Sequence, residues 1–373
     1  MSGGARGALW TVLALALFFA ADSLIFRAGW YGEYLEPDSS AGSLESHLYW
    51  LAYAPAPKVP QVLVVGDSRI AEGFSSRTAT ASTGRSLYFW NLGVGGTVPR
   101  IWYYTLRDLD PTRRRYAAIV IGLDRYSDED WDAEFEDRIS DQNYLVMRLG
   151  FGDCVGFAGS MRTMANRHRA LAGCLFRGMV LRSDVQAFLA DPETRMRRAD
   201  DWLINGLNYD SGYSGKTENL SGLSVDWSNR TIQFPDGVSD PVRAELNRFL
   251  LPEPVANTGA LARYRQRWLG GILDLYKDSP TRLIFLRLPR APLVRPDAFR
   301  PGATISKGFV VSAAHTPRVD VLPAETFTDL ERPEWFADAL HLNRQGRPVF
   351  STRLAGLVDA ILAGRATGTG GGR

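Results

Sequence analysis

The sequence predicts an α/β fold in which helices cover a central parallel sheet. Apolar, strand-like runs occur at residues 62–65, 87–92, 117–121, 283–288 and 319–322. Segments of helical periodicity lie between and after them, at residues 98–109, 261–275 and 344–362. Strands that alternate with helices form buried parallel sheets, and ligands bind outside the carboxyl ends of their strands. Polar residues that directly follow these runs are therefore the candidates for a functional site.

Length and composition agree with one large domain that carries an elaboration, rather than two small domains. The chain has 373 residues, of which 45% are hydrophobic, enough to bury a full α/β core. Its 43 basic and 41 acidic residues leave a net charge of +2, which gives no sign of a nucleic-acid-binding surface. The arginine runs at 113–115 and 195–198 are short and are typical of solvated faces.

Residues 1–27 are typical of a signal anchor or a signal peptide. Arg6 precedes a continuous apolar run at 8–21, and Asp22-Ser23 interrupts before the apolar residues 24–26. A bilayer requires about 20 apolar residues, so the run spans only if the interruption is tolerated. Ala20-Ala21 would permit cleavage, but no polar linker follows. We favour an uncleaved anchor with the rest of the chain outside the cytoplasm. A cleaved signal or a buried helix of a cytosolic protein are the alternatives.

Residues 28–60 are expected to form a connector with an aromatic-rich short helix. The first strand-like run of the core then breaks into Gly66-Asp67-Ser68, as a buried strand does when it delivers a serine to the sheet edge. Taken alone, such a turn is also typical of a polar helix cap. Near the other end of the chain, Asp338 stands three residues before His341. A neutral histidine held by a carboxylate can accept a proton from a serine hydroxyl, so Ser68, His341 and Asp338 are the candidate catalytic residues.

Two further strand-like runs end in residues that suit an oxyanion site. Residues 91–96, Asn-Leu-Gly-Val-Gly-Gly, follow the second run, and Gly122-Leu123-Asp124 closes the third. Backbone N–H groups at Ser68 and Gly96 would donate to the oxyanion formed when an ester carbonyl is attacked, since glycine allows close approach and positive φ.

These motifs together resemble those of the SGNH (GDSL-type) hydrolase superfamily. The resemblance runs from about residue 61 to residue 346, with an unmatched stretch from 126 to roughly 261. It implies a flavodoxin-like three-layer fold, with the SGNH-like domain at 61–363 and an insertion at 128–257. It also implies serine ester chemistry without a cofactor or a metal. Gly96 takes the place of the family's oxyanion glycine, and Asp124 stands where the family usually has asparagine.

Asp124 departs from the pattern because an ionised carboxylate would repel a developing oxyanion. Asp124 is either protonated, or turned away to pair with Arg125 or another cation, or replaced as a donor by Arg125 or Tyr126. We favour pairing, with backbone amides supplying the donors. The structural alternative is that Asp124 only caps its loop. Arg125 and Tyr126 are also candidate substrate contacts.

The inserted stretch begins with acidic residues and later mixes glycine, serine, asparagine and aromatic residues over 202–237. This later part predicts an elaborated loop region or a small β-ribbon. Aromatic faces beside polar groups suit sugars, so four aromatic residues are candidates for a carbohydrate platform. They are Trp202, Tyr209, Tyr213 and Trp227. The alternative is that they form the insertion's own small core.

Cys154 and Cys174 are the two cysteines of the chain and lie within one segment. They would pair in an oxidising periplasm, and two buried free thiols are the alternative. No Cys-x-x-Cys or Cys/His cluster indicates zinc. Residues 364–373 are expected to form a flexible tail.

An exported and anchored domain of this kind resembles the bacterial proteins that add or remove O-acetyl groups on cell-surface or secreted polysaccharides. These include the periplasmic partners of membrane-bound O-acyltransferases. The resulting hypothesis is O-acetyl transfer or deacetylation on a glycan in the bacterial periplasm or cell envelope, through an acyl-enzyme at Ser68. A lipolytic or general carboxylesterase, and a non-catalytic membrane-anchored glycan-binding or assembly factor, are the alternatives.

Overall fold

The structure is a computed structural model that describes residues 3–130, 135–205, 213–226, 228–250, 256–291 and 308–365, without the side chains of 3–6, 202–205 and 249–250. The chain forms two compact units. Unit 1 comprises Met1–Ala54 with Glu134–Leu207, and unit 2 comprises Pro55–Ala133 with Asn208–Arg373. Each unit is thus built from two separate stretches of chain.

Unit 2 contains the predicted parallel sheet. Its strands are β1 (Gln61–Gly66), β2 (Tyr88–Gly93), β3 (Ala118–Leu123), β6 (Arg282–Arg287) and β7 (Val319–Val321). All pair in parallel, in the order β2-β1-β3-β6-β7. This is the order of flavodoxin-like doubly wound sheets. The five predicted runs match these strands to within two residues at either end, so the α/β class and the parallel sheet are confirmed.

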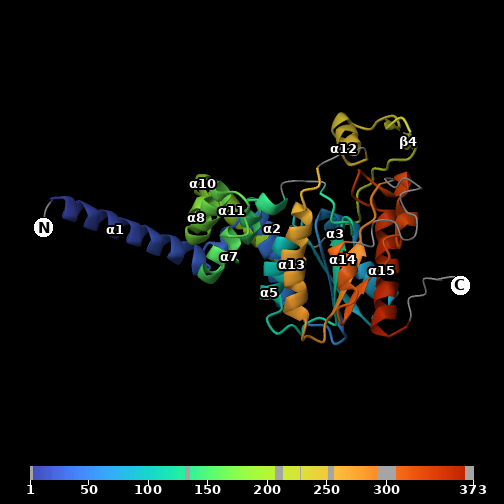
Figure 1. The fold of residues 1–373 in the computed structure, drawn as a ribbon, viewed down its shortest axis with the longest axis horizontal. Helices are drawn as coiled ribbons and strands as arrows, with labels where there is room; N and C mark the ends of the chain where they lie inside the picture. Colours follow the sequence, from blue (N-terminus) through green and yellow to red (C-terminus); the bar gives the residue numbers. More distant parts are fainter. Residues whose placement is uncertain are drawn as a thin grey trace. The chain divides into compact units, whose positions relative to one another are not determined.

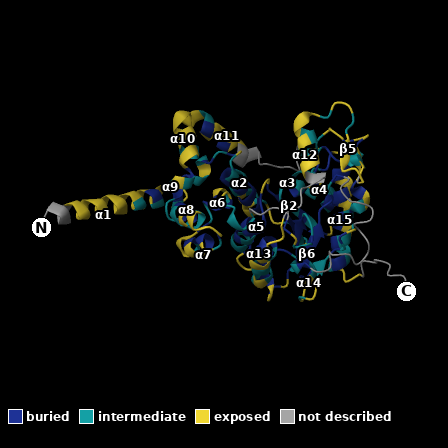
Figure 2. Cartoon of the chain, turned by 45° about the horizontal axis from the view of Figure 1, so that its top comes forward, coloured by how far each residue is buried: buried dark blue, intermediate teal, exposed yellow. Residues whose placement is uncertain are grey.

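Helices cover both faces of this sheet, which makes three layers (Figure 1). The larger ones are α5 (Pro99–Leu109) and α13 (Ala260–Tyr276), which pack together, and α4 (Ser76–Ser82) and α15 (Gly346–Leu362), which do likewise. Alternate strand residues on one face belong to one buried cluster with Phe350, Leu354 and Val358 of α15. These strand residues are Val62, Val64, Ala118, Val120, Ile284 and Leu286. Residues on both faces of the strands are buried (dark blue in Figure 2), because each face meets a helix layer.

The remaining elements of unit 2 are short or lie outside the sheet. They are α3 (Ser68–Gly73), the antiparallel pair β4 (Ser224–Asp226) and β5 (Thr231–Gln233), α12 (Asp240–Leu250), α14 (Phe309–Ala313), and the 3-10 turns η6 (Thr328–Leu330) and η7 (Pro333–Trp335). The β4–β5 pair confirms the predicted small β-ribbon. Val225 and Ile232 of this ribbon pack against the cluster beneath α15, so the ribbon is part of unit 2.

Unit 1 is helical in the part of the chain that the structure describes. Its N-terminal half has α1 (Gly3–Asp22), the π-helical turn η1 (Ser23–Arg27), the 3-10 turn η2 (Gly32–Tyr34) and α2 (Ser40–Tyr53). Its second half has η3 (Phe135–Asp137), α6 (Asp141–Leu145), η4 (Phe151–Asp153), α7 (Cys154–Ala158), α8 (Met164–Leu175), α9 (Arg177–Val180), α10 (Arg182–Ala190) and α11 (Pro192–Asn205).

The composition of unit 1 differs from the predicted layout of one domain with a connector at 28–60 and an insertion at 128–257. Helix α2 in the supposed connector packs against α6 and α11. Phe26, Tyr31 and Leu35 share a buried cluster with Val146 and Leu181. The stretch at 134–207 therefore forms its core with the N-terminal segment. The later part of the supposed insertion belongs to unit 2.

Two predicted features of unit 1 can be located directly. Cys154 and Cys174 form a disulfide with a Cα–Cα distance of 5.4 Å, joining the start of α7 to the end of α8. Residues Gly7–Arg27 form one apolar helical stretch, long enough by length and composition to cross a membrane, and only 11% of it is buried. Figure 2 shows α1 exposed along most of its length. Such a helix is consistent with a signal anchor or a signal sequence.

Candidate active site

Ser68 lies at the carboxyl edge of the sheet, at the point where the chain order of the strands reverses. It directly follows β1 and Asp67 and begins α3, whose N-cap is Asp67. The Asp67 carboxylate accepts from the Arg69 backbone N–H at 2.9 Å, which fixes the turn. Ser68 is half-buried, so its hydroxyl is held in place and still reaches solvent. This is the switch point at which doubly wound folds bind ligands.

His341 and Asp338 reach Ser68 from a turn that precedes α15. The His341 Nε2 atom lies 2.8 Å from Ser68 Oγ. The His341 Nδ1 atom lies 2.8 Å from each carboxylate oxygen of Asp338. Asp338 also accepts from the backbone N–H groups of Leu340 and His341, so the carboxylate shapes the turn as well as the imidazole. The structure thus brings together the three residues that the sequence nominated, although 273 positions separate Ser68 from His341.

The charges around these residues favour an ionised Asp338. Burial by itself raises the pKa of this carboxyl, but hydrogen bonds from His341 and from backbone amides outweigh burial and hold the pKa well below its ordinary value. Burial lowers the pKa of the His341 imidazole, whereas the bond to Asp338 and the negative charge of Asp338 raise it, and the net direction is upward. An ionised Asp338 orients Nδ1–H towards itself and leaves the Nε2 lone pair facing the serine hydroxyl.

A second layer of charged groups surrounds Asp338. The Lys216 ammonium lies 3.2 Å from Asp338 Oδ2 and 3.0 Å from Glu72 Oε2. Glu72 is one turn after Ser68 on α3. Glu245 of α12 faces the same cluster, since the charges of Asp338, His341 and Lys216 all act on its carboxyl. Lys216 comes from the segment at 213–220, whose backbone is bound to the turn around His341.

The loop after β2 borders Ser68. Gly66 and Gly93 pair across β1 and β2, and Thr97 Oγ1 donates to the Gly66 carbonyl at 3.0 Å. A Cβ atom at Gly95 would lie 3.9 Å from Ser68 Cβ, so this loop borders the serine. Gly96 has a φ of 73°, which favours glycine. Backbone N–H groups of Ser68 and Gly96 thus remain the candidate oxyanion donors.

Gly93 is required for a different reason. A Cβ atom there would lie 2.1 Å from the backbone nitrogen of Ala71, so only glycine lets α3 pack this closely on β2. The Asn91 amide then ties the helix down, donating to the carbonyls of Ile70 and Phe74. The Gly-rich segment after the second strand therefore fixes the helix that carries Ser68.

Asp124 does not stand as a free carboxylate at the site. Its oxygens contact Arg69 at 2.6 Å, Arg125 at 3.2 Å and Arg290 at 3.3 Å. Burial favours the neutral acid, but the three guanidinium groups outweigh it and hold the pKa of this carboxyl well below its ordinary range. Of the possibilities open from the sequence, the geometry matches the ion-paired one, and a protonated donor does not fit.

The other predicted substrate contacts have mixed outcomes. Arg125 is partly exposed beside Asp124. The prediction of Tyr126 as a substrate contact is wrong, because Tyr126 is only 2% exposed. Its hydroxyl donates to the carbonyls of Phe285 in β6 and of Leu322 after β7, so it links these two strands. Tyr213 lies near the site, with its hydroxyl 3.3 Å from Glu72. Trp202 falls on α11 of unit 1, with its side chain outside the described part. Tyr209 and Trp227 lie outside the described residues.

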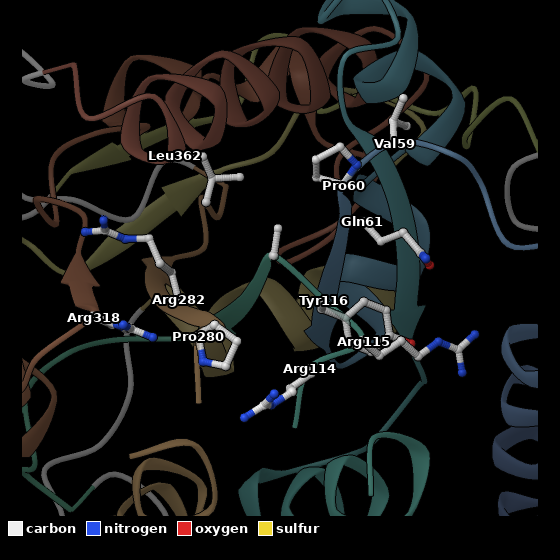
Figure 3. Close-up of a pocket in the computed structure, with 11 residues that line it drawn as sticks. Val59, Pro60, Gln61, Arg114, Arg115, Tyr116, Pro280, Arg282, Arg318 and Leu362 are labelled. Carbon is white, nitrogen blue, oxygen red and sulfur yellow. The ribbon is translucent and has the colours of Figure 1, made fainter. Parts of the chain in front are cut away.

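An arginine-lined pocket occupies the opposite edge of the sheet (Figure 3). It has a volume of about 510 Å³ and lies where β1, β3, β6 and β7 begin, next to Gln61 and Ala117. Arg114, Arg115, Arg282 and Arg318 line it. Arg282 forms a bidentate pair with Asp320, and Arg318 donates to the Ser279 carbonyl. Since a six-residue strand is about 20 Å long, this pocket is remote from Ser68.

Sequence reasoning missed several charged neighbours of the candidate residues, among them Arg69, Arg290, Glu72 and Lys216. Glu72 carries a recognisable signal, since residues four apart share one face of a helix. Lys216 carries none, because it reaches Asp338 from a segment 122 positions away.

In comparisons with known proteins, no protein-family model matches this chain, and no curated protein matches it significantly in sequence.

Proposed function

We propose that this protein performs serine-dependent ester chemistry in the manner of SGNH hydrolases, transferring or removing acyl groups. The observation that carries the proposal is the chain of contacts from Asp338 through His341 to Ser68, each link being 2.8 Å long. A hydroxyl, a base and an orienting carboxylate in series form the arrangement that activates serine. The strand order and the motifs that resemble the SGNH superfamily support the same assignment.

In the proposed reaction, Ser68 Oγ attacks the ester carbonyl carbon while His341 Nε2 accepts the hydroxyl proton. The resulting oxyanion is stabilised by backbone N–H groups of Ser68 and Gly96. The ester C–O bond then breaks, and His341 returns the proton to the departing alkoxide, which leaves an acyl-serine. A second hydroxyl compound, either water or a sugar, delivers its proton to His341 and its oxygen to the acyl carbon. The bond between that carbon and Ser68 Oγ then breaks, and His341 returns the proton to Ser68 Oγ. Water gives deacylation and a sugar gives acyl transfer.

A glycan in the bacterial cell envelope is the substrate class that we propose. The apolar N-terminal helix and the disulfide of unit 1 both suit an exported protein. The segment that carries Tyr213 and Lys216 borders Asp338, so part of the predicted carbohydrate-binding stretch adjoins the candidate residues. The resemblance to polysaccharide O-acetylation proteins makes a membrane-bound O-acyltransferase a reasonable partner.

The test is covalent trapping combined with turnover. The purified full-length protein is treated with a fluorophosphonate and separately with a chromogenic acetyl ester, alone and with an oligosaccharide acceptor. We expect mass spectrometry to find the label on Ser68, and Ser68→Ala to abolish both labelling and acetyl release. Acetylated oligosaccharide would identify a transferase, whereas acetate alone would identify an esterase.

Matched controls separate the competing functions. Ser86, an exposed serine in the turn between α4 and the start of β2, serves as the control through Ser86→Ala, which should keep full activity. Preference for long-chain esters over acetyl esters would favour a lipolytic carboxylesterase. Failure to label or turn over any ester, in a protein that folds correctly and binds oligosaccharides, would overturn the enzymatic proposal in favour of a binding factor.

A further inference from the structure

Part of the apolar helix packs against other helices of unit 1, which leaves only its first part free to enter a membrane. Phe18 packs on Phe176, and Phe19 packs on both Phe151 and Phe176, with ring centroids 5.5–5.6 Å apart. Only the stretch before these contacts stands clear of the other helices of unit 1. The charged residue Arg6 ends the apolar part, so the clear apolar stretch runs from Gly7 to Leu17 and is roughly 16 Å long at 1.5 Å per residue. The hydrocarbon core of a bilayer is about 30 Å thick, so the clear stretch falls short.

Five of the exposed apolar side chains of unit 1 lie on elements next to the base of the helix. We call them the collar: Leu24, Ile25, Phe151, Val155 and Met179. Leu24 and Ile25 lie on η1, and Met179 lies on α9, which packs against η1. Phe151 touches Phe19, and Val155 follows it one turn later with 77% of its surface exposed. Water-exposed apolar groups of this size, next to an apolar helix, indicate a surface that meets lipid.

The collar is fixed to the base of the helix. Asp22 is buried, and its carboxylate accepts from the backbone N–H groups of Arg177 and Gly178 at 3.0 and 2.8 Å. The Arg177 guanidinium donates to the carbonyls of Phe26 and Leu149. The Cys154–Cys174 disulfide joins the α7 side of the collar to the segment before α9. The helix therefore cannot enter the membrane to its full length unless the collar enters with it.

We propose that the collar inserts into the lipid bilayer around the end of α1 and completes the span that the helix alone is too short to make. Acyl chains are the occupant, because the collar continues the apolar surface of the helix and makes up the missing length. The Arg27 guanidinium lies 3.7 Å from the Phe151 ring centroid and donates to the carbonyls of Leu149 and Cys174, which holds Phe151 of the collar in place. This inference rests on the proposed membrane anchoring and is independent of the ester chemistry.

Depth-dependent fluorescence quenching tests the collar. An environment-sensitive fluorescent amino acid is placed at position 155 of the full-length protein, which is then reconstituted into nanodiscs of phosphatidylethanolamine and phosphatidylglycerol with doxyl-labelled acyl chains. Position 189 on α10 is the matched control, because Leu189 is also apolar and 68% exposed but lies outside the collar. Position 179 serves as a second collar site. We expect quenching at 155 and 179 to exceed quenching at 189 several-fold.

Equal quenching at the collar and control positions, in a protein that stays in the nanodisc, would overturn the collar and leave the anchor standing. It would then point to protein, rather than lipid, as the occupant. Intact-mass measurement of the same preparation checks the premise. A mass that lacks the residues before Asp22 would overturn both the anchor and the collar. Neither readout uses ester cleavage, so a failure of the proposed catalytic function would be seen separately.

Discussion

The candidate site holds two partly buried carboxylates, and the two have different partners. Asp338 faces a histidine that reaches the serine, whereas Asp124 faces three guanidinium groups. Both carboxyls have a pKa held below the ordinary value, so both are ionised at neutral pH. The effect of each negative charge therefore depends on the group that it contacts. Asp338 makes its neighbour a better base, while Asp124 cancels positive charge.

The largest loss of activity is expected when Ser68 or His341 is replaced. Ser68→Ala and His341→Ala each should lower ester turnover by about 1,000-fold or more, since residues that act as one unit fail together. The double variant should lose little beyond either single variant. Circular dichroism should show an unchanged fold, because Ser68→Ala removes only a half-buried hydroxyl. Retention of a tenth of the activity by Ser68→Ala would exclude it as the covalent nucleophile.

Asp338→Asn should produce the next largest effect. An amide in this position can donate to Nδ1 and so favour the imidazole tautomer that no longer accepts from serine, which costs up to about 10⁴-fold in related arrangements. The loss should appear in kcat with little change in KM. Asn219→Ala, at an exposed turn, is a control of similar chemistry that should leave turnover unchanged. A loss of less than tenfold would mean that another group orients His341.

At the second carboxylate, Asp124→Asn should change the free energy of unfolding more than the rate of ester turnover. Removing this charge takes a shared carboxylate from three guanidinium groups, of which Arg69 keeps its pair with Asp67, and should destabilise unit 2 by about 3 kcal/mol, measured by urea unfolding. Turnover per folded molecule should stay the same or rise, because the carboxylate is not needed and an amide can donate to an oxyanion. Since the pKa of Asp124 is lowered, its contribution is present above the ordinary carboxyl range and is lost as the pH falls through the lowered pKa. The stability difference should therefore shrink in strong acid. A large loss of turnover in the folded variant would show that the carboxylate has a chemical role.

The smallest effects should come from the charges around Asp338, and they should have opposite signs. Neutral His341 is the active base, so activity falls as the pH drops through the His341 pKa, which lies above the ordinary histidine value. Glu72 raises this pKa and Lys216 lowers it. Glu72→Gln should thus extend activity to lower pH, and Lys216→Met should restrict it to higher pH. NMR titration measures the same pKa without turnover, and His341→Gln assigns the signal among the four histidines. Shifts in one direction for both variants would contradict this arrangement.

Much of the sheet was predictable because its signals are local. Apolar runs of strand length mark β1, β3 and β6, and helical periodicity marks α13 and α15, so each element is recognisable without its partners. The division into two units was not predictable. It depends on Phe26 and Tyr31 packing against Val146 and Leu181, and no local pattern specifies contacts between such distant residues.

In the candidate site, too, residues with a local sequence signal were predictable and residues without one were not. Ser68 and His341 stand out because each lies in a short motif with its own carboxylate or glycine. Lys216 and Arg290 join the site only through the fold, and a single lysine or arginine in a long loop carries no distinguishing pattern. Tyr126 failed as a substrate contact because its position after a strand says nothing of where its ring points. Its hydroxyl reaches strand-end carbonyls that belong to β6 and to the residue after β7.

The contact between Asp22 and Arg177 also sets an order of events during synthesis. The two residues are 155 positions apart, so a ribosome adding about 5–20 residues per second needs roughly 8–30 s to make the second after the first. During the proposed export, the apolar helix meets the export machinery while the Asp22 carboxylate at its base has no backbone amides to bind. We expect nascent chains stalled before residue 177 to expose residue 22 to added protease, and chains stalled well beyond residue 180 to protect it. The proposed membrane segment would thus enter the bilayer before the residues that hold its base have been made.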